Sequence, residues 1–173
     1  IAQLPPTAVG AFNAGQMGAL PPDAFAGFRP NQIAALPPTA LGGLSGQQIA
    51  ALPPTAMSAF KPTQFAALPP AAMSGFQPTQ VGALPPDALR AMKPDQFSAM
   101  PPMAFAGFKP AQIDVMPPSV FSAMAPEQLN AMPPSVFKVM DPKQVQSLPP
   151  TAVAGFSPNQ VGLLPPAAFA AFK

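Results

Sequence analysis

The amino-acid sequence predicts an all-α fold, a solenoid or superhelix of very short helices with two helices in each 16-residue repeat. Three observations lead to this prediction. Pro-Pro pairs recur every 16 residues without insertion or deletion, large apolar residues keep a fixed phase relative to those pairs, and one glutamine recurs in each unit. A fixed internal period is the sequence signature of arrays whose units pack against their neighbours.

The repeat array is predicted to be a single domain covering residues 1–173. Ten full 16-residue units occupy residues 5–164, and a partial unit follows at residues 165–173. Because the chain begins at Ile1 rather than Met, we expect it to be a fragment of a longer protein. The first prolines of the pairs are Pro5, Pro21, Pro37, Pro53, Pro69, Pro85, Pro101, Pro117, Pro133, Pro149 and Pro165.

Each unit divides into two related octads. With the first proline of a pair as position 1, large apolar residues occupy positions 5, 8, 13 and 16, as Phe25, Phe28, Ile33 and Leu36 do in unit 21–36. Positions 5 and 8 thus recur eight residues later at 13 and 16. We call positions 1–8 the proline-pair octad and positions 9–16 the glutamine octad, because position 4 is Ala or Val while position 12 is always Gln.

Each octad is expected to hold one short helix. A residue that precedes proline is disfavoured in the α region, whereas proline fits the first helical position. Positions 2 and 10 are therefore predicted helix starts, with N-caps at positions 1 and 9. Large apolar residues directly before the N-cap and at the fourth helical position form the hydrophobic-staple pattern. Helices of about a turn and a half are unstable alone, so we expect a core shared between stacked units.

The glutamine at position 12 falls at the third helical position, where its side chain can accept a hydrogen bond from the N-cap backbone N–H. Ser45 and Ser157 would complete reciprocal capping boxes, and Asn13 and Asp141 would approximate them. We interpret these glutamines as a structural capping column in preference to a ligand-binding ladder. The column comprises Gln16, Gln32, Gln48, Gln64, Gln80, Gln96, Gln112, Gln128, Gln144 and Gln160.

Alternation of two octad types suggests an even number of octads in each coil. Two other architectures compete with the helical solenoid. The 30 prolines are compatible with a disordered proline-rich chain, although their restriction to helix-start positions favours order. A β-solenoid is disfavoured because strand interiors do not accept Pro-Pro pairs.

The composition argues against catalysis and cofactor binding. The chain has no Cys and no His, which removes disulfides, thiolate chemistry, histidine bases and the usual zinc sites. The six acidic residues fall in four different columns, so no pair recurs for acid–base work or calcium. We expect no enzyme activity, no cofactor and no metal. A net charge of +2 does not indicate a nucleic-acid binder, and proline interrupts every apolar run before it could span a membrane.

Position 9 is basic in five units, and stacking of successive units would align these side chains into a broken positive stripe. Such a stripe could contact an anionic polysaccharide or a membrane surface, but we favour the simpler interpretation that these charges occupy solvated N-cap positions. Asp141 and Ala125 occupy the same column and interrupt it. The basic residues are Arg29, Lys61, Lys93, Lys109 and Lys173.

The octads resemble two known groups of repeat proteins. Residues 45–52, 60–65 and 156–161 resemble the Leu-Thr-x-x-Gln-Ile-x-Ala type of tandem repeat in large bacterial surface and secreted proteins. Residues 124–129 and 132–137 resemble the mesothelin-like superhelical repeats of animal cell-surface proteins. The chain differs from both in its unbroken 16-residue spacing and its scarcity of charge. Both resemblances imply short α-helices wound into a superhelix at a cell surface, and neither implies an enzyme.

These features predict a structural tandem-repeat protein, an extended stalk, fibre or filament component at a cell surface or outside the cell. The alternative is an adhesion or ligand-binding solenoid module. We expect self-association, end to end or lateral, because neither end of the array carries a polar capping repeat. Other surface proteins and polysaccharide are the remaining partners that the sequence suggests.

Overall fold

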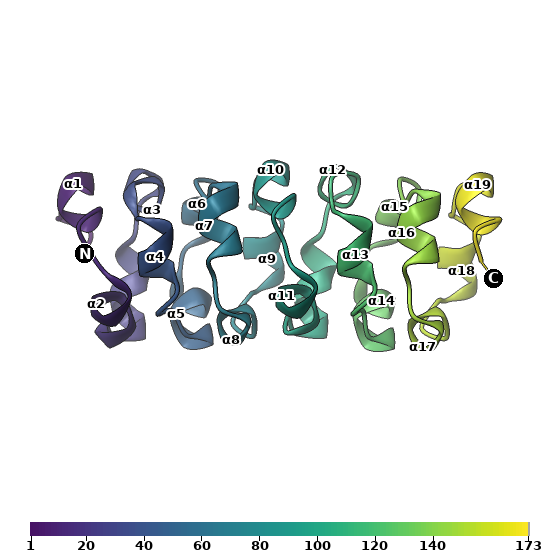
Figure 1. Cartoon of the computed structure of the whole chain (residues 1–173), viewed down its shortest axis with the longest axis horizontal. Coiled ribbons are helices and arrows are strands. Elements are labelled where there is room, and N and C mark those ends of the chain that lie inside the picture. The colour runs from purple at the N-terminus through teal and green to yellow at the C-terminus, as the bar shows by residue number, and fades with distance from the viewer. Residues whose placement is uncertain (173) are drawn as a thin grey trace.

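The computed structural model describes residues 1–172, which form an all-α solenoid of short helices (Figure 1). This confirms the predicted fold class. The described residues contain 21 helices and no strand. In chain order the helices are α1 (Pro6–Val9), α2 (Ala14–Ala19), the 3₁₀ helix η1 (Pro22–Gly27), α3 (Pro30–Ala35), α4 (Pro38–Leu41), α5 (Gly46–Ala51), α6 (Pro54–Met57), α7 (Pro62–Ala66), α8 (Pro70–Met73), α9 (Pro78–Val81), α10 (Pro86–Leu89), α11 (Pro94–Ser98), the 3₁₀ helix η2 (Pro102–Gly107), α12 (Pro110–Ile113), α13 (Pro118–Phe121), α14 (Pro126–Ala131), α15 (Pro134–Phe137), α16 (Pro142–Gln146), α17 (Pro150–Val153), α18 (Pro158–Val161) and α19 (Pro166–Phe169).

Proline sets the helix starts, as the sequence predicts. Every described helix begins with proline except α2 and α5, where Ala14 and Gly46 stand at position 10. The preceding N-cap residues are extended, with φ −68° and ψ 144° at Pro37 and φ −91° and ψ 156° at Lys61. Each octad therefore holds one helix, because the N-cap residue before the next helix is extended, and where that helix begins with proline the α region is disfavoured for the N-cap residue.

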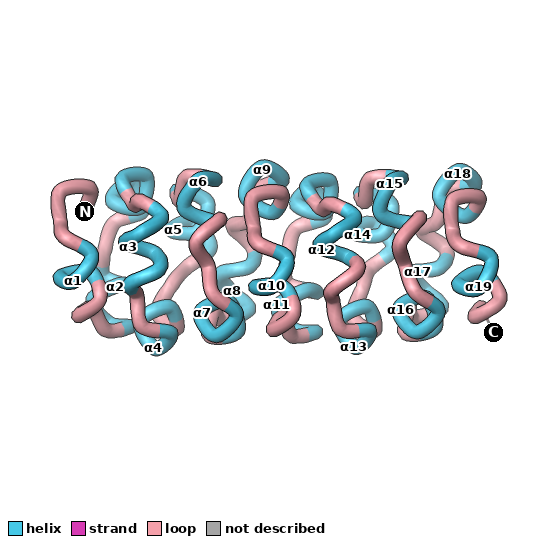
Figure 2. The backbone as a smooth tube through the Cα atoms, turned by 90° about the horizontal axis from the view of Figure 1, so that it is seen from above, coloured by secondary structure: helices cyan, strands magenta, loops and turns pink. Residues whose placement is uncertain are grey.

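Three consecutive octads, 24 residues, complete one coil. Each helix packs on the third helix after it in the chain: α4 on α7, α7 on α10, and, with the 3₁₀ helix η2 counted, α10 on α12. Figures 1 and 2 show the coils in a row along the long axis, with the two ends of the chain at opposite ends of the row.

Stacking of helices three places apart gives the solenoid three faces. The first face is α1, α3, α6, α9, η2, α14 and α17, the second is α2, α4, α7, α10, α12, α15 and α18, and the third is η1, α5, α8, α11, α13, α16 and α19. The prediction of an even number of octads per coil is wrong. With an odd number of octads in each coil, proline-pair octads and glutamine octads alternate along every face. With an even number, each octad would stack on an octad of its own type.

The core is one continuous cluster that runs from Val9 to Ala168. Its members are the large apolar residues at positions 5, 8, 13 and 16 and the Ala or Val at position 4. Phe97 is fully buried, and its ring centroid lies 4.9 Å from that of Phe105 and 5.7 Å from that of Phe121. Phe105 belongs to the next coil on a neighbouring face, so the core joins coils as well as helices.

Glycine at position 7 allows the closest approach between coils. A Cβ built on Gly43 would overlap the backbone carbonyl of Ala14, and one built on Gly107 would overlap that of Pro78. Each partner is the first residue of the helix one coil earlier. No described glycine has a positive φ, so these positions require glycine for its lack of a side chain and not for its backbone freedom.

Candidate functional site

The glutamine column is the most specific polar feature of the described molecule, and it lies inside the coil junctions. Nine of the ten glutamines are 1–4% exposed, whereas Gln16, in the first coil, is exposed. A buried amide is costly unless its donors and acceptor are all bonded. The hydrogen bonds of these side chains therefore define their role. The buried members are Gln32, Gln48, Gln64, Gln80, Gln96, Gln112, Gln128, Gln144 and Gln160.

The Oε1 atom of each glutamine caps its own helix. In all ten it accepts a hydrogen bond from the backbone N–H of the N-cap residue three positions earlier, at 2.8–3.1 Å. At Asn13, Ser45, Asp141 and Ser157 the N-cap side chain accepts a reciprocal bond from the glutamine N–H. The remaining N-caps lack this second bond, so there the glutamine alone serves the helix start.

The Nε2 atom of each buried glutamine reaches a different coil. Gln64 donates to the carbonyl oxygens of Ile33 and Leu36, both at 2.7 Å. These residues lie at the end of α3, 31 and 28 residues earlier in the chain. The same two offsets recur for every other buried glutamine. One side chain thus satisfies the N-terminus of its own helix and the C-terminus of another.

Small residues above and below make room for each buried amide. The residues 24 positions from Gln64 are Ala40 and Ala88, which are fully buried on α4 and α10 of the same face. Since three octads close a coil, each glutamine from Gln32 to Gln144 stands between two position-4 residues, whereas Gln16 and Gln160 at the ends of the column have one each. Alternation of octad types along each face therefore keeps two glutamines from competing for one space.

The inter-coil donor role is the part of this site that sequence reasoning missed. A capping box accepts Glu as readily as Gln at the third helical position. Position 12 is Gln in all ten full units and never Glu. This preference indicates that the side chain must donate hydrogen bonds as well as accept one. The identity of its acceptors depends on the coil period, which the octad pattern does not contain.

The structure does not bring the position-9 basic residues into one stripe. Successive 16-residue units are two octads apart around a coil of three, so each unit is turned by two thirds of a coil from the last. Arg29 precedes a helix of the first face and Lys93 one of the third, while Lys61 and Lys109 share the second face two coils apart. Lys173 lies outside the described residues.

Two of these lysines cover the C-terminus of a helix in the preceding coil. Lys61 Nζ donates to the carbonyl oxygen of Ala34 at 2.8 Å, and the Lys109 side chain lies beside Gly82 at the corresponding place on another coil. A cation at a helix C-terminus is favourable because carbonyl groups there lack intrahelical partners. Position 9 thus has a local structural use that needs no external ligand.

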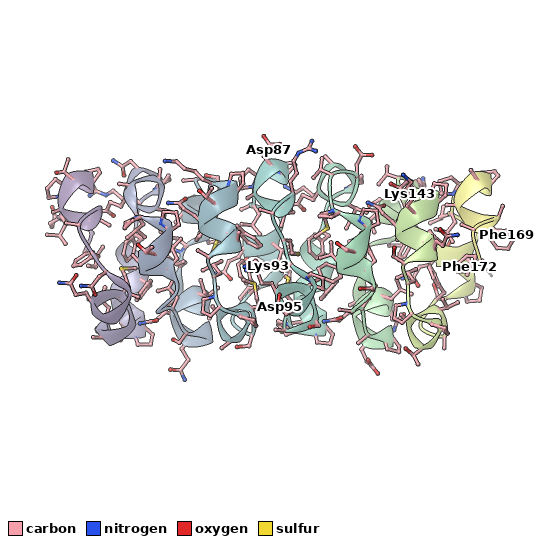
Figure 3. The ribbon with its side chains drawn as sticks, viewed as in Figure 1. Asp87, Lys93, Asp95, Lys143, Phe169 and Phe172 are labelled. Atoms are coloured by element: carbon pink, nitrogen blue, oxygen red, sulfur yellow. The ribbon has the colours of Figure 1, made fainter. Side chains whose placement is uncertain are left out.

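The remaining charges are dispersed over the exposed surface (Figure 3). Arg90 and Asp87 form an ion pair at 3.1 Å with side chains 60% and 79% exposed, and exposed pairs of this kind contribute little stability. No group of three potential metal-ligating side chains occurs within residues 1–172. None of the described helices has the length and apolarity of a membrane-crossing segment.

A shallow groove of about 650 Å³ crosses several coils where the first and second faces meet. Its walls are mainly proline rings and small residues, with one cation at Lys109 and hydroxyls at Thr55 and Ser58. The Ser58 hydroxyl already donates to the Thr55 carbonyl oxygen at 2.8 Å. The groove therefore offers a long apolar surface with few polar groups.

Neither the family models nor the curated proteins with which this chain was compared contain a match to it. The resemblance of its octads to bacterial surface repeats and to mesothelin-like repeats stays a prediction.

Proposed function

We propose that this chain is a structural tandem-repeat protein, an extended stalk, fibre or filament component at a cell surface or outside the cell. The observation that carries the proposal is the sameness of the coil junctions. Nine buried glutamines make the same pair of inter-coil contacts, so a further unit can be added without altering those already present. No catalytic role is proposed, because the sequence has no Cys or His and its six carboxylates fall in four different columns of the repeat.

An array of this kind lengthens in proportion to its number of octads. The 21 described helices make seven coils, and helices pack about 8–10 Å apart, so the solenoid is about 56–70 Å long. Its core is continuous from Val9 to Ala168, which supports a stiff rod. A stiff rod of adjustable length is what a spacer requires.

Self-association of the ends belongs to the same proposal. Leu4 is 38% exposed near the N-terminal end and Phe169 is 54% exposed at the C-terminal end, beside Phe172 (Figure 3). These side chains belong to columns that inner coils bury. Covering them against another array would remove apolar surface from water.

The proposal is tested by changing the number of repeats. Duplication of residues 37–84, which are 48 residues or two coils, should lengthen the rod by about 16–20 Å in small-angle X-ray scattering while leaving its cross-section unchanged. A growth in cross-section would contradict a linear array. Immunogold labelling of intact cells tests the location, and labelling confined to the interior would reject a surface role.

A ligand-binding module is the second candidate, and the groove beside Lys109 is the observation that favours it. A single cation and two hydroxyls along an apolar trough suit an anionic polysaccharide better than a neutral small molecule. Binding on a glycan array that weakens with salt and with Lys109→Ala, but not with Lys143→Ala, would support this role. Absence of any salt-sensitive glycan would reject it.

A further inference from the structure

The residue at position 16 supplies a carbonyl to every buried coil junction, and its side chain changes along the array. Gln64 Nε2 donates to the Leu36 carbonyl at 2.7 Å, whereas Gln128 Nε2 donates to the Met100 carbonyl at 2.9 Å. The acceptor is leucine in the first six buried junctions and methionine in the last three. In chain order the acceptors are Leu4, Leu20, Leu36, Leu52, Leu68, Leu84, Met100, Met116 and Met132.

Position 8, the other corner between octads, changes in the same segment. Every residue at positions 8 and 16 from residue 92 to residue 140 is methionine except Phe108, whereas those from residue 20 to residue 84 are all Leu or Phe. Met92, Met116 and Met140 follow α10, α12 and α15, which pack in succession along the upper edge in Figure 1. We call the six residues the methionine corners: Met92, Met100, Met116, Met124, Met132 and Met140.

A thioether is the most easily oxidised group in this chain, which has no Cys, His, Trp or Tyr. Hydrogen peroxide transfers one oxygen atom to the sulfur. The sulfur gives up two electrons, the O–O bond breaks, and the peroxide leaves as water. The product is a polar sulfoxide, which disrupts an apolar core. No buried side-chain nitrogen or oxygen within residues 1–172 lacks a hydrogen-bond partner, so the new oxygen would find no idle side-chain donor.

The methionine corners lie at the edge of the core and not at its centre. Their side chains are 1–4% exposed, whereas Met57 and Met73, at position 5, are 0% exposed. A corner residue also carries part of the junction, since the Met116 carbonyl accepts a hydrogen bond from Gln144 Nε2 at 3.1 Å. Oxidation of a corner therefore alters the residue on which the glutamine of another coil depends.

We propose that residues 92–140 form a redox-sensitive segment of the solenoid, whose coil junctions loosen when a peroxide oxidises the methionine corners. The junctions that rest on leucine, within residues 20–84, stay closed. A solenoid can respond in this local way because each coil contacts only its neighbours. This response goes beyond the proposed structural role and depends only on the chemistry of the junctions.

The test is hydrogen exchange of the full 173-residue chain before and after treatment with hydrogen peroxide. Peptide mass spectrometry assigns each sulfoxide and the exchange rate of each segment. Met103 is 56% exposed at position 3, so its sulfoxide should form first and leave exchange unchanged. Once the methionine corners are oxidised, amide exchange within residues 92–140 should rise at least about tenfold, while exchange within residues 20–84 should change less than about twofold.

Two variants separate the corners from other methionines. Replacement of all six corners by leucine, the residue that stands at position 16 in the first six junctions, should abolish the rise in exchange. Met103→Leu should leave the rise intact. Unchanged exchange in a chain with six oxidised corners would overturn the proposal, as would corners that stay reduced after Met103 is fully oxidised. An equal rise within residues 20–84, or a rise that survives in the six-leucine variant, would also overturn it.

Discussion

The side-chain Nε2 of Gln64 lies 2.7 Å from the carbonyl oxygen of Leu36, a residue 28 positions earlier on the neighbouring coil. The same side chain accepts a hydrogen bond from the N–H of Lys61 at 2.9 Å. One neutral side chain therefore ties the start of its helix to the end of a helix in another coil. Repetition of this contact through the array explains how helices of four to six residues remain folded in a chain that has no Cys for disulfides.

Removal of one inner glutamine should be costly. Gln64→Ala leaves the Lys61 N–H and the Leu36 carbonyl without partners at a buried junction and leaves the Ile33 carbonyl with the Leu36 N–H alone, and we expect a loss of about 2–4 kcal/mol of unfolding free energy. Urea denaturation followed by circular dichroism measures this as a lower midpoint. Gln16→Ala is the matched control, because Gln16 is exposed and caps only its own helix. Equal losses for the two variants would contradict the inter-coil role.

Two adjacent glycines should respond oppositely to alanine. A methyl group on Gly43 meets the Ala14 carbonyl, whereas one on Gly42 lies at an ordinary contact of 3.5 Å from the Thr39 carbonyl oxygen. Gly43→Ala should therefore cost about 1–3 kcal/mol through overpacking. Gly42→Ala should stabilise by about 0.4–1 kcal/mol, since its φ of −64° suits alanine. Thermal unfolding of both variants checks the signs, and a stable Gly43→Ala variant would show that the coils are less closely packed.

The aromatic core should be sensitive to position along the array. Phe97 is fully buried among Phe105, Phe108 and Phe121, so Phe97→Ala should cost about 3–5 kcal/mol. Phe169 carries the same side chain but is 54% exposed, and its replacement should cost much less. An equal fall of the urea midpoint for the two variants would contradict the burial of Phe97 in the core and the exposure of Phe169 at the end of the array.

Salt should have little influence on stability. The Arg90–Asp87 pair is largely exposed, so Asp87→Asn should change the unfolding free energy by less than about 0.5 kcal/mol. A denaturation midpoint that moves little between low and molar NaCl would agree with cohesion from apolar packing and neutral hydrogen bonds. A steep fall with salt would point instead to charge pairs as the main cohesion.

The helix starts could be predicted from the sequence because they depend on local chemistry. Proline at positions 2 and 10 and the apolar residues around it act within a single octad, and the observed helices begin there. The number of octads per coil could not be predicted in this way. It depends on how the corners between octads pack, and a strict 16-residue repeat is compatible with a coil of 24 residues.

The hydrogen bonds of the glutamine column likewise include local bonds that could be predicted from the sequence and inter-coil bonds that could not. The bond from Lys61 N–H to Gln64 spans three residues and follows from helix geometry. The bonds to Ile33 and Leu36 span 31 and 28 residues and follow only once the coil period is known. The predicted basic stripe failed for the same reason, because the alignment of Lys61 with Lys93 required successive units to stack directly.

The central claim is therefore the coil of three octads, and one distance tests it most directly. Thr63 on α7 and Ser135 on α15 are exposed and are connected through α10 and α12 on the second face. The chain has no cysteine, so Thr63→Cys and Ser135→Cys give two unique sites for spin labels. Double electron–electron resonance should give a narrow distance distribution centred near three helix spacings, about 24–30 Å. A broad distribution, or a centre near the 36–45 Å or so expected for four and a half coils of two octads each, would contradict the account.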